Sequence, residues 1–240
     1  MNIIGLEEID STNSYAKINI ETLADKTVIH AQRQTLGRGR LNRKWVDLGE
    51  GNLFMSIVLK PSDRFNELYS NITQYLSVAL CNVLESYGLQ PQIKWPNDVL
   101  INGKKIAGIL SETVMQGTNF KGLVLGIGVN LNAEQADVEN IPDRVVTSLN
   151  LELSHNINLD DFRNTLLEEF FKNYDNFIEN GFETIKDDYI NRNCFLNKEL
   201  NIQVFNNTIS GFAKAVSDNG ALVLQAQNNE ESVLTIGDIL

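Results

Sequence analysis

Apolar and polar positions recur along the chain with two different periods, which predicts both strands and helices. Short apolar runs bounded by polar or turn residues predict strands at residues 2–9, 28–33, 53–59, 99–101, 105–113 and 122–131. Apolar residues at three- and four-residue steps predict amphipathic helices at residues 65–87 and 160–179. Asn102-Gly103 predicts a tight hairpin turn. This pattern indicates a mixed α+β fold.

The C-terminal part of the chain follows a different pattern. Short strands separated by asparagine-containing turns are predicted there, at residues 200–205, 210–216, 221–225 and 232–236. A module of roughly 40 residues is marginal alone because a small domain buries little surface, so we expect it to pack on the larger part. We therefore divide the chain into a large domain, residues 1–192, and a small β-barrel, residues 193–240.

Residues 34–52 contain four glycines and no apolar periodicity, as in long loops that are functional or disordered. Residues 33–45 hold five of the 20 basic residues and no acidic residue, although the net charge is −11. A basic cluster is usually a solvated surface, but this contrast favours anion binding. Gly37 and Gly39 allow the backbone to approach a ligand closely, and the neighbouring arginines can bind phosphate or carboxylate oxygens in pairs.

The composition excludes several classes of protein. A net charge of −11 disfavours nonspecific binding to DNA or to an anionic membrane. No apolar run reaches the roughly 18 residues of a membrane span, and the first residues lack the features of a signal peptide. Cys81 and Cys194 provide neither a disulfide framework nor a zinc site. The sequence has no dinucleotide-binding or P-loop motif. We expect a soluble, cytoplasmic protein with neither DNA nor a membrane as its partner.

A second cluster of chemically informative residues lies in the middle of the chain. Lys94-Trp95-Pro96-Asn97-Asp98 precedes the predicted hairpin, which carries Lys105 and Gly108. Taken singly, Asn97 and Asp98 are ordinary turn residues, and a hairpin lysine is more often solvated than catalytic. A glycine inside a strand indicates a bulge or the close approach of another group.

Together, the two clusters resemble the biotin protein ligases. Residues 37–45 are similar to the GRGRxxRxW signature of that family, and residues 94–99 match its KWPNDV segment. The resemblance continues with Ser-Thr-Asn at residues 11–13, KxxGILxE at residues 105–112 and GxGxN at residues 126–130. The motifs occur in the family's order and cover the whole chain.

Two departures from the family pattern bear on function. Leu41-Asn42 stands where some relatives carry Arg-Gly. Relatives that also repress transcription begin with a helix-turn-helix domain, whereas the motifs here begin by residue 11. The resemblance therefore implies the monofunctional class of ligase.

The resemblance implies an α+β fold, with a mixed-sheet catalytic domain of the class II synthetase-like, biotin/lipoate ligase type and an SH3-like β-barrel. It implies that biotin and ATP form biotinyl-5′-AMP and pyrophosphate, with Mg²⁺ handling the triphosphate. Biotin then passes to a lysine of a biotin carboxyl carrier protein, from acetyl-CoA carboxylase or a related carboxylase. Because the first step joins two anions, catalysis should depend on cationic positioning.

The resemblance also implies roles for individual residues. The residues expected to be catalytic are Arg40 and Lys105. Those expected to bind biotin are Ser11, Thr12, Asn13, Gln34, Gly37, Arg38, Gly39, Arg40, Lys105 and Gly108. Those expected to bind ATP are Arg40, Arg43, Trp45, Asn97, Lys105 and Asn130, and Mg²⁺ is expected near Asn97 or Asp98. Ser11, Thr12 and Asn13 are also typical of a helix cap, and we expect both roles.

Other functions remain as alternatives. A lipoate or octanoate ligase shares the fold and the acyl-adenylate chemistry, but those relatives lack GRGRxxRxW and KWPND. A non-catalytic biotin sensor would not need Arg40, Lys105 and Trp45. A nucleic-acid-binding regulator is disfavoured by the acidic charge. A single chain does not decide between a monomer and a homodimer.

Overall fold

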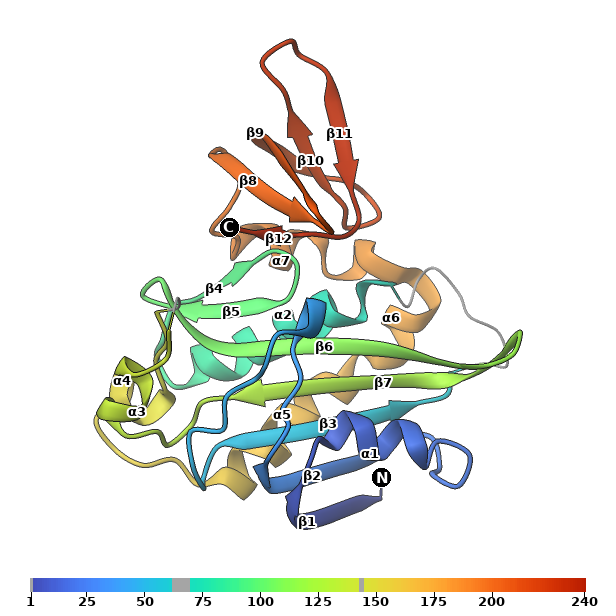
Figure 1. Cartoon of the computed structure of the whole chain (residues 1–240), viewed down its shortest axis with the longest axis vertical. Helices are drawn as coiled ribbons and strands as arrows, with labels where there is room; N and C mark the ends of the chain where they lie inside the picture. Colours follow the sequence, from blue (N-terminus) through green and yellow to red (C-terminus); the bar gives the residue numbers. More distant parts are fainter. Residues whose placement is uncertain (1, 62–69, 143–144) are drawn as a thin grey trace.

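The protein consists of a seven-stranded sheet covered by helices and a smaller five-stranded sheet, as the computed structural model shows (Figure 1). The structure describes residues 2–61, 70–142 and 145–240. The strand order in the larger sheet is β1-β2-β3-β7-β6-β5-β4, and only the β1–β2 pair is parallel. The strands are β1 (Ile3–Ile9), β2 (Thr27–Gln34), β3 (Leu53–Leu59), β4 (Pro91–Lys94), β5 (Asp98–Ile101), β6 (Lys104–Gln116) and β7 (Asn119–Val129).

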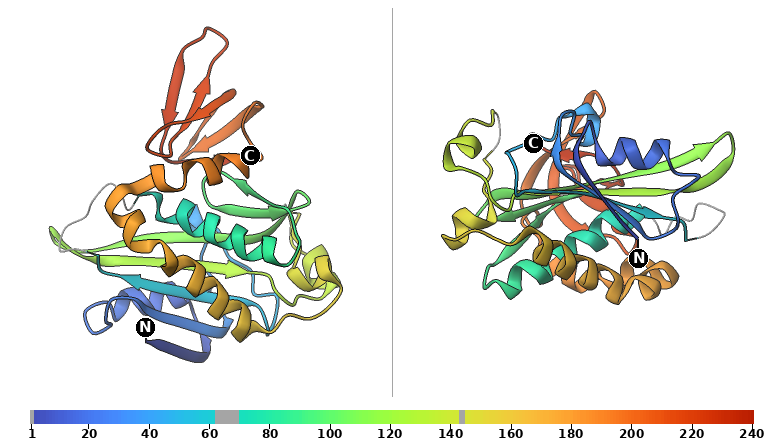
Figure 2. Two further views of the ribbon diagram at one scale, coloured as in Figure 1. Left: turned by 180° about the vertical axis from the view of Figure 1, so that it is seen from behind. Right: turned by 90° about the horizontal axis from the view of Figure 1, so that it is seen from below.

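Helices cover the two faces of this sheet unequally. α2, α5 and α6 lie across one face, whereas α1 lies on the opposite face (Figure 2). The α-helices are α1 (Thr12–Ile18), α2 (Ile72–Ser86), α3 (Gln135–Glu139), α4 (Leu149–Leu153), α5 (Leu159–Lys172), α6 (Tyr174–Asn180) and α7 (Lys186–Asn191). Two short 3-10 helices are η1 (Arg40–Asn42) and η3 (Gly181–Thr184). No helix in the described part of the chain is long and apolar enough to cross a membrane.

Alternate residues of the central strands serve different layers. Met55 and Ile57 of β3 belong to the large core under the helices, whereas Val58 belongs to a small core under α1. On β7, the α1 side includes Gly126 and Gly128, which lie against side chains of α1 and of the glycine-containing loop. Because glycine has no side chain, this part of the sheet surface stays open to other groups.

The C-terminal sheet is antiparallel, with the strand order β11-β10-β9-β8-β12. Its strands are β8 (Glu199–Val204), β9 (Asn207–Val216), β10 (Leu222–Gln225), β11 (Glu231–Leu234) and β12 (Asp238–Ile239). Ile202 and Leu222 join the large core, and the Gln74 amide of α2 donates a hydrogen bond to the Gly220 carbonyl at 2.9 Å. This arrangement agrees with the expected α+β fold and SH3-like module, and we keep the division between residues 192 and 193 as a proposal.

The two long predicted helices differ from those observed. The helix predicted at residues 160–179 is two helices, because Asn173 between α5 and α6 has non-helical angles, φ −120 and ψ 14. The helix predicted at residues 65–87 is present as α2, and residues 65–69 lie outside the described residues. Periodicity of apolar residues continued across Asn173, so it did not reveal the break.

The predicted strand at residues 53–59 is confirmed, and two short strands were not predicted. β4 is four residues long and β12 is two residues long, which is too short for an alternating pattern to be recognised. β6 extends past both ends of its prediction, whereas β7 begins and ends earlier than predicted, and the two strands are joined at residues 117–118. β12 matters most for the site, because it ends the C-terminal sheet beside the pocket described next.

Candidate active site

A pocket of about 940 Å³ lies between the α1 side of the large sheet, the glycine-containing loop and the C-terminal residues. Most of the residues predicted to form the site line this pocket. They are Ser11, Thr12, Asn13, Gln34, Arg38, Gly39, Arg40, Arg43, Trp45, Asn97, Asp98, Lys105 and Gly108.

Two predicted site residues lie beside the pocket lining. A Cβ atom at Gly37 would overlap the Trp45 carbonyl oxygen, so this glycine permits the loop to close on itself. Asn130 is buried, and its amide donates a hydrogen bond to the Thr147 carbonyl at 3.0 Å. In this structure Asn130 supports the loop that follows β7, and its assignment to ATP stays a prediction.

One end of the pocket is a network of uncharged polar groups at the start of α1. Ser11 is the N-cap of α1, and its hydroxyl accepts a hydrogen bond from the Ser14 amide at 3.4 Å. The Thr12 amide and hydroxyl lie 2.8 and 3.1 Å from Gln34 Oε1. The expected cap is therefore present, and it brings Thr12 and Gln34 together across 22 positions in sequence.

Ser56 of β3 completes this polar end. Its hydroxyl lies 2.6 Å from Asn13 Oδ1 and 2.8 Å from Thr12 Oγ1, and it is fully buried. A Cβ atom at Gly126 would overlap the Asn13 amide, so only glycine permits this position. Sequence reasoning missed Ser56, because a single serine in an apolar strand carries no motif.

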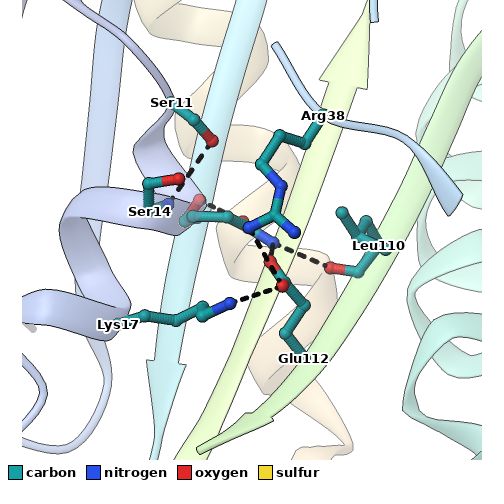
Figure 3. A network of polar contacts seen from close by, with 8 residues as sticks. Ser11, Ser14, Lys17, Arg38, Leu110 and Glu112 are labelled. Carbon is teal, nitrogen blue, oxygen red and sulfur yellow. Dashed lines mark hydrogen bonds and ion pairs between the residues drawn. The ribbon is translucent and has the colours of Figure 1, made fainter. Parts of the chain in front are cut away.

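Glu112 of β6 connects the polar end to the first arginine of the loop (Figure 3). Its carboxylate accepts hydrogen bonds from Lys17 at 2.7 Å and Asn13 at 3.0 Å, and lies 3.2 Å from Arg38 Nη1. Burial would raise the pKa of Glu112, but the hydrogen bonds and the positive charges of Lys17 and Arg38 lower it below its usual value. The carboxylate therefore stays ionised and holds Arg38 at the pocket wall.

The Trp45 indole packs against two glycines of the large sheet. Gly108 of β6 and Gly128 of β7 are paired across the two strands, and a Cβ atom at either would overlap the Trp45 indole. Lys105 Nζ lies 5.4 Å from the centroid of the indole ring. The indole Nε1 is buried and has no hydrogen-bond partner within the described residues. An aromatic plane thus borders the pocket next to a cationic side chain.

The cationic end of the pocket contains side chains from three segments. Lys105 Nζ forms an ion pair with Asp98 at 2.6 Å, and Arg40 donates a hydrogen bond to Asn97 Oδ1 at 3.2 Å. Arg40 and Arg43 each form an ion pair with Asp238 of β12 at 3.0 Å. Burial lowers the pKa of Arg40, and the charges of Asp238 and Asp98 oppose that shift.

Asp238 is the second residue that sequence reasoning missed. It comes from the last strand of the chain, in a segment without any motif, and no pattern relates it to the basic loop. Its burial next to two arginines is visible only in the fold.

The expected Mg²⁺ ligands are already engaged by cations in this structure. Asp98 pairs with Lys105, and the Asn97 oxygen accepts from Arg40. No group of three or more His, Cys, Asp or Glu side chains that could hold a metal ion occurs within the described residues. An oxygen donor set of this size suits Mg²⁺ only together with ligand phosphates, so a magnesium position at Asn97 or Asp98 stays a prediction.

The cysteines are packing residues rather than nucleophiles. Burial raises the pKa of Cys81 in α2 to about 12, and burial also raises the pKa of Cys194. His30 of β2 lies 3.3 Å from an Arg163 Nη1 atom of α5, on the helix-covered side. None of the three lines the pocket.

These groups place an uncharged hydrogen-bonding end and a cationic end in one pocket. The cationic end can neutralise two anionic groups brought close together, because each guanidinium offers several N–H donors. The polar end can hold an uncharged head group that both donates and accepts hydrogen bonds. The pocket is therefore suited to joining an acid to a phosphate-bearing compound.

Comparison with known proteins agrees with this description. Residues 5–130 match the Biotin/lipoate A/B protein ligase family. The chain is 30% identical to the biotin--[acetyl-CoA-carboxylase] ligase of Paracoccus denitrificans, and the alignment covers 92% of each. It is 29% identical to the bifunctional ligase/repressor BirA of Bacillus spizizenii, covering 97% of this chain and 72% of that protein. The biotin protein ligase of Aquifex aeolicus in complex with biotin and ATP has a TM-score of 0.83 and 27% identity, covering 100% of this chain and 97% of that one.

Proposed function

Because the chain belongs to the biotin/lipoate A/B protein ligase family, we propose that it is an ATP-dependent biotin protein ligase. In the first step a biotin carboxylate oxygen attacks the α-phosphorus of ATP, giving biotinyl-5′-AMP while pyrophosphate leaves. In the second step a lysine amine of the acceptor attacks the acyl carbon, AMP leaves, and an amide bond is formed.

The division of the pocket into two ends is the observation that supports this reaction. Biotin has an uncharged ureido head and a carboxylate tail. Thr12, Asn13 and Gln34 supply donors and acceptors for the head, with Ser56 fixing the Asn13 amide. Arg40 and Lys105 lie at the other end, where the carboxylate and the phosphate must meet.

Positive charge at that end supports the chemical step. The carboxylate and the α-phosphate repel each other, so a site that neutralises both lowers the cost of bringing them into contact. We assign this work to Arg38, Arg40 and Lys105. Asp98 and Glu112 keep two of these cations at the pocket before the anions arrive, through ion pairs of 2.6 Å to Lys105 and 3.2 Å to Arg38.

We assign the nucleotide to the side of the pocket that contains Arg43 and Trp45. The arginine is suited to phosphate oxygens and the indole to the adenine plane. Mg²⁺ enters as the ion bound to the triphosphate, with Asn97 or Asp98 as its protein oxygen donors.

The acceptor in this proposal is a biotin carboxyl carrier protein, because the Paracoccus denitrificans relative is a ligase that acts on acetyl-CoA carboxylase. We propose acetyl-CoA carboxylase or a related carboxylase as its source. The cytoplasmic location is also a proposal, and the choice between a monomer and a homodimer stays open.

The test is biotin-dependent exchange of pyrophosphate into ATP by the purified chain, with lipoate and octanoate as comparison acids. We expect exchange with biotin alone, and a loss of roughly 100-fold or more in Lys105→Ala, which removes a cation from the reacting groups. Lys121→Ala is the matched control, because Lys121 of β7 forms its ion pair with Glu21 and does not line the pocket.

Other outcomes would change the proposal. Exchange that depends on lipoate or octanoate would identify a ligase for those acids. The family to which the chain belongs includes lipoate ligases in its name. Tight biotin binding without any exchange would identify a sensor. Equal losses in the Lys105 and Lys121 variants would show that the cation at the pocket has no special part in adenylation.

A further inference from the structure

The last strand of the chain carries a carboxylate out of the C-terminal sheet and into the pocket. β12 pairs with β8, with Asp238 opposite Gln203 and Ile239 opposite Ile202. Gly237, which precedes it, has φ +144, and a Cβ atom there would overlap Ile202. The backbone of Asp238 thus belongs to the C-terminal sheet, while its side chain lines a pocket formed mainly by the larger sheet.

Asp238 bridges two arginines of the basic loop. Oδ1 lies 3.0 Å from Arg40 Nη1, and Oδ2 lies 3.0 Å from Arg43 Nη1. The Asp238 side chain is only 10% exposed, whereas that of Arg43 is 44% exposed. A carboxylate removed from water in this way requires a charge partner, and the two arginines supply it.

The bridge affects how the arginines can be used. Two guanidinium groups on one short turn repel each other, and a half-exposed arginine has many rotamers to lose when it binds a ligand. A carboxylate between them reduces the repulsion and restricts both side chains in advance. Each guanidinium has five N–H donors, so one ion pair to Asp238 leaves donors for phosphate oxygens.

We propose that Asp238 is a positioning residue for the nucleotide end of the site, holding Arg40 and Arg43 where the triphosphate binds. The C-terminal sheet is thereby part of the nucleotide site rather than a separate module. This inference rests on the proposed function, which assigns Arg43 to the nucleotide and Arg40 to the α-phosphate and the biotin carboxylate.

The experiment is the KM for ATP and for biotin in pyrophosphate exchange, compared between the wild type and Asp238→Asn. The asparagine keeps the size and one oxygen but removes the charge that pairs with both arginines. We expect the KM for ATP to rise about tenfold, because the two arginines lose the carboxylate that positions them in the ground state and the transition state alike. The KM for biotin should rise less than the KM for ATP, because the polar end that holds the ureido head lies at α1, away from Asp238.

Asp218→Asn is the matched control. Asp218 belongs to the same C-terminal part of the chain and forms an ion pair of 2.6 Å with Lys186 of α7, away from the pocket. This variant removes another carboxylate that links the C-terminal part to the helices. It should leave both KM values unchanged.

A double variant tests whether Asp238 acts through an arginine. If it positions both arginines, adding Asp238→Asn to Arg43→Ala should raise the KM for ATP by less than Asp238→Asn does in the wild type, because only the effect through Arg40 remains. Independent, multiplied effects would contradict positioning through Arg43.

Several results would overturn the inference. A lower KM for ATP in Asp238→Asn would show that the carboxylate competes with phosphate, and an unchanged KM would show that it has no influence. Equal effects of Asp218→Asn would indicate general loosening of the C-terminal sheet. If the wild type shows no exchange, the proposed function fails, and calorimetric ATP binding by the same variants still decides the role of Asp238.

Discussion

At the scale of single residues, two glycines of β7 determine how closely other side chains approach the pocket floor. The Asn13 amide packs against Gly126, and the Trp45 indole packs against Gly128. Asn13 is fixed in turn by Ser56 on one side and Glu112 on the other. The geometry of the polar end of the pocket therefore requires that position 126 has no side chain.

This dependence predicts the effect of Gly126→Ala. The added methyl group overlaps the Asn13 amide, so α1 must shift and the polar end loses its geometry. We expect the KM for biotin to rise about 10- to 100-fold, as small displacements of positioning groups commonly do, with a smaller change for ATP. Pyrophosphate exchange at varied biotin concentration provides the measurement.

The control for this prediction is Gly117→Asn in the turn between β6 and β7. Gly117 has φ +59 with no atom near its virtual Cβ, and asparagine tolerates that backbone conformation. An unchanged biotin KM in both variants would show that Asn13 does not contribute to biotin binding.

At the scale of elements, aromatic side chains join the helices that cover the back of the sheet. The Tyr75 ring of α2 stacks on Phe177 of α6 with centroids 4.4 Å apart, and its hydroxyl donates a hydrogen bond to the Phe170 carbonyl of α5 at 2.6 Å. Burial raises the pKa of Tyr75, which keeps the hydroxyl protonated as a donor. These contacts link three helices on the side of the sheet opposite the pocket.

We therefore expect Phe177→Ala to lower the free energy of unfolding by about 3–5 kcal/mol, through lost burial and the cavity it leaves. Phe177 is fully buried, whereas Phe205, in the turn after β8, is 66% exposed. Phe205→Ala should change stability by less than about 0.5 kcal/mol. Urea unfolding followed by circular dichroism compares the two, and similar losses would refute the described core.

At the scale of the whole molecule, charged groups connect layers that are distant in sequence. Asp238 links the C-terminal sheet to the basic loop, and Lys186 links α7 to Asp218. His30 joins the large sheet to α5 through Arg163, 3.3 Å away. Burial lowers the pKa of His30 from 6.5, the charge of Arg163 lowers it further, and Asp160 opposes these effects.

The lowered pKa predicts how stability depends on pH. The unfolded chain binds a proton at His30 near pH 6.5 while the folded chain does so only at lower pH, so the stability is complete above pH 6.5. Below that pH the free energy of unfolding should fall, by up to about 1.4 kcal/mol per pH unit for one proton, until the folded histidine also titrates.

Urea unfolding between pH 7.5 and 5.5 measures this slope. His30→Gln should flatten it, because the substituted side chain does not titrate in this range. A slope that is unaffected by the His30 substitution would assign the pH dependence to other groups.

Much of the site could be predicted because its chemistry lies in contiguous strings. Arg38, Arg40 and Trp45 occur in one loop, and Lys105 and Gly108 occur in one strand, at spacings typical of a known family. The structure brings these two strings into one pocket. Adjacent residues stay near one another in any fold, so local spacing retains its meaning.

Ser56 and Asp238 could not be predicted for the opposite reason. Each is a single polar residue in a segment without chemical pattern, and each contacts residues far away in sequence. The break between α5 and α6 was missed for a related reason, because apolar spacing records which face is buried and not where the backbone bends.

The amino-acid sequence by itself determined the α+β class, the family resemblance and the identity of the cationic and hydrogen-bonding groups. Periodicity and motif spacing are local properties, so they can be recognised in the sequence without knowledge of the fold. Only the tertiary structure decided which groups meet: Asn13 on Gly126, Trp45 on Gly108 and Gly128. It also brought Asp238 of the last strand to the arginines of the loop. Such contacts depend on strand order and packing, which no single segment encodes. Residues far apart in sequence contact each other only after the chain between them has folded.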